Sequence, residues 1–125
     1  MDAGIVVFGR LANQTIAASR IYPLILPQQP TYPAITYQTI SSVRTHAMGQ
    51  DSQVVRVRMQ VNCWGRTYAE AHALARQVTT QLSRFKGEVS GITVLDVLLD
   101  NELDTYESDT QTRRVIQDYS LFLTE

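Results

Sequence analysis

Between Val54 and Trp64 the chain alternates strictly between apolar and polar side chains. The apolar positions are Val55, Val57, Met59, Val61 and Cys63, and the polar positions between them are Arg56, Arg58, Gln60 and Asn62. Successive side chains of a β-strand point to opposite faces of the sheet, so a period of two predicts a strand with one covered and one open face. Whatever else the chain builds must cover one side of this strand.

Three further segments are rich in β-branched and aromatic residues and predict strands: Ala34 to about Val43, Ile92 to Asp100, and Arg113 to Leu123. About ten polar residues including Gly49, over about 44–53, separate the first of them from the strand at 54–64. That connection is longer than a tight turn needs and predicts an extended hairpin arm. The last two strands flank a predicted loop over about 101–112.

Two helices are predicted. The clearer one opens at Thr67, which forms a capping box with Glu70, and closes at Lys86 and Gly87. Its apolar stripe consists of Tyr68, Ala71, Ala75, Val78, Leu82 and Phe85. The other helix runs from Ala3 to about Ser19, with Asp2 as N-cap. Its apolar pattern consists of Ile5, Phe8, Ala12 and Ile16 with the intervening Leu11 and Ala18. Four prolines at 23, 27, 30 and 33 keep the following connector extended.

These elements predict an α+β fold. The expected architecture is a two-layer domain, with an antiparallel sheet of about four strands and two helices on one face, in the order helix-strand-strand-helix-strand-strand. A chain of 125 residues has the commonest domain size, so residues 1–125 are expected to form a single domain. No stretch approaches the roughly 20 apolar residues that cross a bilayer, so no membrane association is expected.

Composition narrows the function. Charged residues make up 18% of the chain and the net charge is −1. A nucleic-acid-binding protein usually carries a strong positive charge, so this net charge argues against that class. A weakly charged surface is also prone to self-association. Cys63 is the only cysteine, so the chain can form no internal disulfide, and the metal sites built on paired cysteines are absent. Both features favour a chain that works as part of an oligomer in a reducing compartment.

No residue group in the sequence forms a convincing catalytic, cofactor or metal site. Cys63 lies on the apolar face of its strand and is interpreted as a buried hydrophobe. His46 and His72 lack the partner at i+4 that a metal pair or an HExxH motif requires. We therefore expect no enzymatic activity and no cofactor.

An acidic stretch and a set of arginines are the candidate interaction residues. The acidic positions are Asp96, Asp100, Glu102, Asp104, Glu107 and Asp109, with no basic residue among them, and the stretch lacks the glycine of a calcium loop. Its interpretations are a solvated tip, a surface for a partner, or the lining of a lumen. The basic candidates are Arg44 and His46 in the arm, Arg56 and Arg58 on one strand face, and Arg113 and Arg114 at the start of the last strand. We hypothesise that acidic residues of one subunit meet arginines of the next head to tail, which closes rings.

Three segments resemble the tail-completion, or tail-terminator, family of long-tailed bacteriophages. They are RIYPLILPQQPTYPAITYQTIS, VRVRMQVNCWGRTYAEAHALA and RRVIQDYSLFL, and the resemblance covers nearly the whole chain in order. It implies an α+β subunit without enzymatic activity, which forms a ring, usually of six, that caps the tail tube and joins it to the head-side connector. It also implies assembly in the host cytoplasm and a final place at the head-tail junction of the virion.

In such a ring the arm Arg44 to Gln53 and the loop Asn101 to Thr112 are the expected contacts to the tube below and the neck above. DNA would pass through the lumen without specific binding, and an acidic lining would keep it from sticking. The resemblance carries no residue-level binding site. Two alternatives remain: a head-closure or other neck or minor tail assembly protein, and a nucleic-acid-binding module that uses Arg56, Arg58, Arg113 and Arg114.

Overall fold

The computed structural model of the chain describes residues 3–47, 50–108 and 111–124, and for residues 45–47 and 50–53 it describes the backbone only. The elements in chain order are α1 (Ala3–Leu11), β1 (Ile21–Pro23), β2 (Ala34–Ala47), β3 (Gln50–Gly65), α2 (Tyr68–Leu82), β4 (Gly87–Val89), β5 (Ile92–Glu107) and β6 (Thr112–Thr124).

The strands form one six-stranded sheet in the order β1-β2-β3-β6-β5-β4. β1 runs parallel to β2, and the other neighbouring pairs are antiparallel. The α+β class is confirmed, and the four predicted strands are the four long ones. The prediction of about four antiparallel strands was incomplete, because β1 and β4 have only three residues each and carry no readable periodicity.

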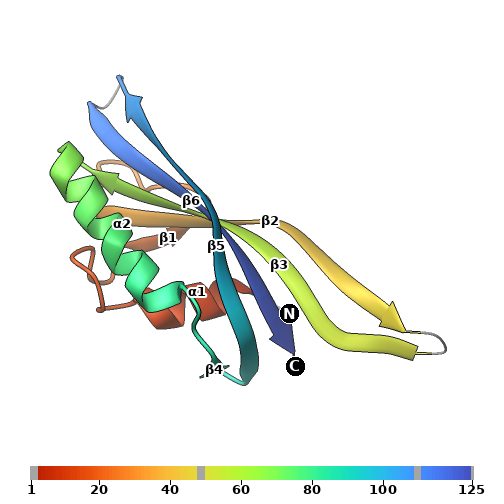
Figure 1. The fold of residues 1–125 in the computed structure, drawn as a ribbon. Coiled ribbons are helices and arrows are strands. Elements are labelled where there is room, and N and C mark those ends of the chain that lie inside the picture. The colour runs from red at the N-terminus through yellow and green to blue at the C-terminus, as the bar shows by residue number, and fades with distance from the viewer. Residues whose placement is uncertain (1–2, 48–49, 109–110, 125) are drawn as a thin grey trace.

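Both helices lie on the same side of the sheet (Figure 1). We call this side the covered face and the other side the open face. The five apolar side chains of the β3 alternation all point to the covered face and are at most 3% exposed. Tyr119, Leu121 and Leu123 of β6 join them in the same core. The predicted division of β3 into two faces is confirmed.

Two long hairpins extend from this core in different directions (Figure 1). One is formed by β2 and β3, which pair out to Ala47 and Gln50. The other is formed by β5 and β6, which pair out to Glu107 and Thr112. The predicted arm over 44–53 and the predicted acidic loop over 101–112 are therefore mostly strand rather than loop. The sequence did not indicate these strand ends, because their side chains are mostly polar on both faces and show no apolar alternation. Backbone hydrogen bonds between the strands continue whether or not a face is buried.

The predicted N-terminal helix was too long. α1 ends at Leu11, and the backbone turns through left-handed conformations at Asn13 and Ala18 before β1. Its buried side chains include Val6, Val7 and Leu11. Three residues of the predicted stripe are exposed instead, namely Ile5 (42%), Phe8 (43%) and Ile16 (42%). The predicted N-cap Asp2 lies outside the described residues.

Helix α2 begins where the sequence predicts. Thr67 is the N-cap, and its hydroxyl accepts a hydrogen bond from the backbone N–H of Glu70 at 3.1 Å. The Glu70 carboxylate reaches back to the N–H of Arg66 at 3.0 Å, one residue before the position expected of a capping box. The helix end was predicted wrongly, because Arg84 and not Gly87 takes the left-handed conformation after it, and Gly87 begins β4.

Thr67→Ala should lower the free energy of unfolding by about 1 kcal/mol, because the N–H of Glu70 loses its acceptor. Thr80→Ala is the matched control, since Thr80 is exposed on the same helix and its hydroxyl only bonds back to the carbonyl of Arg76. Chemical denaturation measures both. Equal losses in the two variants would show that the cap contributes nothing.

Candidate interaction surfaces

The thiol of Cys63 is fully buried, and this burial, followed by the charge of Glu102, raises its pKa far above the usual range. The thiol therefore stays protonated and is a poor nucleophile. Among the described residues, no group of three or more His, Cys, Asp or Glu side chains could hold a metal ion. No helix in that part of the chain is long and apolar enough to span a membrane.

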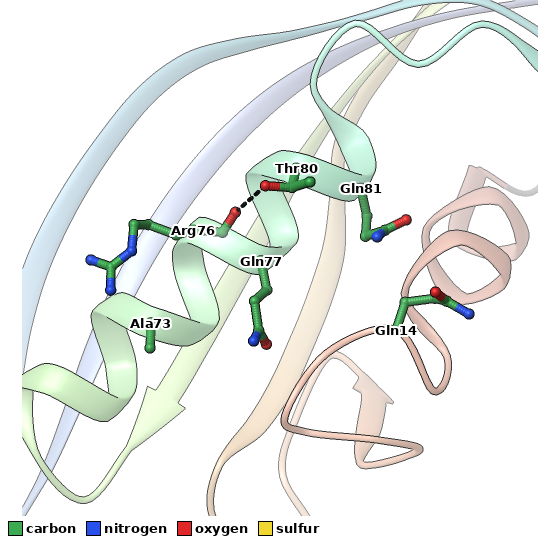
Figure 2. A pocket seen from close by; sticks show the side chains of 6 residues that line it. All are labelled: Gln14, Ala73, Arg76, Gln77, Thr80 and Gln81. Carbon is green, nitrogen blue, oxygen red and sulfur yellow. Dashed lines mark hydrogen bonds between the residues drawn. The ribbon is translucent and has the colours of Figure 1, made fainter.

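A groove of about 260 Å³ lies between α2 and the segment that follows α1 (Figure 2). Its lining consists of Gln14, Ala73, Arg76, Gln77, Thr80 and Gln81. The Gln77 amide oxygen accepts from the N–H of Ile16 at 2.7 Å, and Gln81 accepts from the guanidinium of Arg10 through its backbone and side-chain oxygens. These contacts hold α1 and its following segment against α2, so the groove is explained by the packing of the fold.

The basic arm is the part of the β2–β3 hairpin that carries Arg44, Arg56 and Arg58, all three exposed. Arg56 and Arg58 alternate with the buried β3 residues and so lie on the open face. Arg44 lies opposite the buried Val55, which puts it on the covered-face side, beyond the core. The backbone of His46 pairs with Asp51 in the same arm, and its side chain lies outside the described residues.

The acidic hairpin is the part of β5 that carries Asp100, Glu102, Asp104 and Glu107, together with the facing part of β6. Its carboxylates are split between the two faces. Glu102 and Asp104 lie opposite Gln117 and Val115, which are buried on the covered face. Asp100 and Glu107 lie on the open face, where they meet Ser120 and Arg114. Asp109 lies outside the described residues.

Each of these carboxylates has a partner in its own chain. Glu102 accepts from the Gln117 amide at 3.2 Å, and Asp104 lies 3.2 Å from the Nε2 atom of His72. The hydroxyl of Ser120 donates to Asp100, and the Arg114 guanidinium lies 2.8 Å from the carboxylate of Glu107. Asp96, at the base of the strand, pairs with Arg84 at 3.1 Å. The acidic hairpin is therefore held in shape by its own neighbours.

Arg113 and Arg114 are brought to opposite faces. Arg113 donates to the carbonyl of Arg66 at 3.0 Å and covers the ring of Tyr106. Arg114 lies over the ring of Trp64. The structure thus pairs Glu107 with Arg114 within one chain, where their contact joins the two strands of the hairpin.

One surface was missed by the sequence interpretation. Tyr68 stacks on His72 with ring centroids 4.1 Å apart, and a groove of about 340 Å³ lies beside them against Asp104, Tyr106 and Arg113. Tyr68 is 62% exposed and Tyr106 54%. The sequence feature that could have indicated this surface was Tyr68, the first residue of the predicted apolar stripe.

A family sequence model described as "Tail completion protein gp17" matches residues 7–124. The chain belongs to this family. The match begins within α1 and ends with the last residue of β6, so it spans both hairpins and α2. It confirms the family that the three sequence segments resemble.

The tail completion protein also shares its fold with a chain in a solved structure titled "Virion of native gene transfer agent (GTA) particle". The TM-score is 0.76 at 11% identity, over 95% of this chain and 92% of that chain. No curated protein matches the chain. Family membership makes the tail completion protein a structural component of the tail of a phage-like virion. Such a component must contact other proteins of the tail or head, so its surfaces carry its function.

Proposed function

We propose that this tail completion protein forms a closed ring of about six copies that caps the finished tail tube and joins it to the head-side connector. DNA passes through the lumen without specific binding. The observation that carries the proposal is the placement of opposite charges on two hairpins that leave the sheet in different directions (Figure 1). The basic arm carries Arg44, Arg56 and Arg58, and the acidic hairpin carries Asp100, Glu102 and Asp104.

Unlike surfaces at two places on one chain favour head-to-tail contacts. A two-fold dimer pairs one patch with itself, so it could match the arm with the acidic hairpin only if both lay in one patch, whereas the two hairpins leave the sheet in different directions (Figure 1). A head-to-tail contact instead places the arm of one copy on the acidic hairpin of the next. When the rotation between copies closes, such contacts form a ring and leave no hairpin without a partner.

The acidic hairpin serves better as a subunit contact than as a lumen lining. A lining would require the carboxylates to share one face, whereas Glu102 and Asp104 lie on the covered-face side and Asp100 and Glu107 on the open face. Beyond the short pairing of β4 with Ile92–Val94, β5 is the outermost strand of the described sheet, so carboxylates on both of its faces are accessible from the side. A neighbouring subunit that approaches along this edge reaches both sets.

The ring is tested with the purified protein, alone and mixed with tail tubes that lack a cap. Light scattering gives the mass, and negative-stain microscopy shows whether a ring sits at the tube end. A ring of defined mass at the end of the tube is the expected result. A protein that stays a compact monomer and leaves the tube uncapped would overturn the proposal.

Arg56→Glu combined with Arg58→Glu should convert the ring to smaller species at roughly 150 mM salt, because two attractive contacts at every junction become repulsive. The matched control is Arg76→Glu with Lys86→Glu, since these side chains are also exposed but lie on and after α2. It makes the same change in net charge away from the arm. An intact ring in the first variant would exclude Arg56 and Arg58 from the junction.

A further inference from the structure

Two strands of the sheet have an edge that is only partly occupied. β1 pairs with β2 over Ile35–Tyr37, and in the described part of the chain no strand pairs with that side of β2 beyond Tyr37. At the opposite edge of the sheet, β4 pairs with β5 over Ile92–Val94. Among the described residues, no strand pairs with this edge of β5 between Val94 and Glu107. Unoccupied edges of long strands offer rows of backbone donors and acceptors to another chain.

The direction of these backbone groups follows from hydrogen bonds at the occupied ends. The carbonyl of Tyr37 accepts from Leu24, so Tyr37 directs its backbone groups away from β3. In an antiparallel ladder, alternate residues of a strand direct their N–H and C=O groups to the same edge. After the bulge near Ile40, the register shows that Ser42 and Arg44 direct theirs away from β3, as Tyr37 does.

The same reasoning applies to β5. The carbonyl of Val97 accepts from the N–H of Arg84, so Val97 directs its backbone groups away from β6. After the bulge that follows Leu99, the register shows that Glu102, Asp104 and Tyr106 also direct their backbone groups away from β6. Their N–H and C=O groups therefore face the unoccupied edge.

We propose that the free edge of β2 in one copy pairs antiparallel with the free edge of β5 in the next, with Ser42 opposite Asp104. This proposal rests on the ring proposed above and names the strands that form its junction. β2 and β5 run in opposite directions within one sheet, so copies arranged head to tail bring them together antiparallel. The pairing continues one sheet into the next.

This register matches side chains as well as backbone groups. It places Arg44 opposite Glu102, which pairs opposite charges on the covered-face side. On the open face it places Val43 opposite Leu103, two apolar side chains that are 57% and 42% exposed in the single chain. A shift by two residues in either direction separates Val43 from Leu103. The apolar pair selects this register, since a shift that puts Ser42 opposite Tyr106 would still place Arg44 opposite a carboxylate, that of Asp104.

The open-face arginines fit the same junction. Arg56 lies opposite Val43 and Arg58 opposite Ser41, one strand in from the free edge. By this register Arg56 lies level with Leu103 and Arg58 level with Thr105 of the next copy, and the nearest open-face carboxylate there is Glu107, two residues beyond Thr105. Long guanidinium side chains can bridge the one intervening strand, since neighbouring strands lie only about 4.8 Å apart. The charge contacts of the ring and the strand pairing thus describe one interface.

The required offset between copies agrees with a closed barrel. Ser42 lies level with Val97 across the sheet through Val57 and Leu121, whereas its proposed partner Asp104 is further along β5. At about 3.3 Å per residue, and allowing for the bulge, the offset is about 20 Å. Four long strands about 4.8 Å apart span about 19 Å, so the strands would tilt by about 45° from the ring axis. Closed barrels tilt their strands by about 35–45°.

A disulfide tests this register directly. Val43→Cys and Leu103→Cys are introduced together into the full chain, and the assembled ring is oxidised. Within one chain these positions are separated by β3 and β6, about 14 Å across, so no bond can form inside the chain. The native Cys63 is fully buried and does not react. The proposal predicts a ladder of cross-linked species up to the full ring on a non-reducing gel.

The matched control is Ser42→Cys with Leu103→Cys, which moves one thiol to the opposite face and should give no ladder. If the ring forms but the Val43 and Leu103 pair gives no ladder, or if the control links equally well, the strand pairing is wrong and the ring proposal stands. If the protein forms no ring with or without tail tubes, the ring proposal fails and the strand pairing fails with it.

Discussion

Tyr119→Ala is expected to lower the free energy of unfolding by about 3–5 kcal/mol, the largest loss for any single change considered in this protein. Tyr119 lies in β6 beneath α2 and is the largest of the fully buried side chains. Alanine leaves a cavity there. It also removes the hydroxyl that donates to the Gln117 amide oxygen at 2.8 Å. Urea denaturation followed by circular dichroism measures the loss.

Tyr119→Phe separates the two contributions. It keeps the ring and removes only the hydroxyl, which leaves the amide oxygen of the buried Gln117 without this donor. The expected loss is about 1–3 kcal/mol. If phenylalanine cost as much as alanine, the hydrogen bond and not the volume of the ring would govern this part of the core.

Gly65→Ala is expected to cost about 2–3 kcal/mol through overpacking. Gly65 is the last residue of β3, and an added Cβ would lie 2.7 Å from the backbone nitrogen of Ala71 and 3.0 Å from its Cα. These are backbone atoms in the first turns of α2, so relief requires the helix to move. Such a movement would disturb the bond from the Gln117 amide to the carbonyl of Ala75. Thermal unfolding checks the expected loss.

Gly9→Ala provides the matched comparison, because its added Cβ would also meet an atom at 2.7 Å. That atom is the Cγ1 of Val89, a side-chain atom on the short edge strand β4, which can give way. The change also favours helix formation in α1, so the net effect should stay within about 1 kcal/mol. Equal losses in the two variants would contradict the distinction between backbone and side-chain contacts.

The sequence predicted the parts of this fold that depend on local periodicity. The alternation over 54–64 identified the two faces of β3, and Thr67 with Glu70 located the start of α2. It failed where the local signal was weak or misleading. The apolar spacing of Ile5, Phe8 and Ile16 predicted a long buried helix, yet those side chains are exposed and α1 ends at Leu11. Several apolar residues in this segment can form more than one helical stripe, and only packing selects among them.

The candidate surfaces were predicted as sets of residues but not as an arrangement. The sequence singled out the arginines and carboxylates, and the predicted strand places the neighbours Arg113 and Arg114 on opposite faces. It did not indicate that Glu107 pairs with Arg114 in the same chain. The groove beside Tyr68 and Tyr106 was missed, because its sides come from α2 and the β5–β6 hairpin, which are distant in sequence.

By itself the sequence determined the class of fold, the two faces of β3, the start of α2 and the family. Each of these follows from the spacing of nearby residues or from residue motifs. Only the tertiary structure decided that the polar arm and the acidic segment are strands, and which strand edges remain unoccupied. A strand is stabilised by hydrogen bonds to a partner far away in the chain, so its length and its free edge depend on where that partner ends. That property belongs to the folded sheet, and the junction between copies proposed here depends on it.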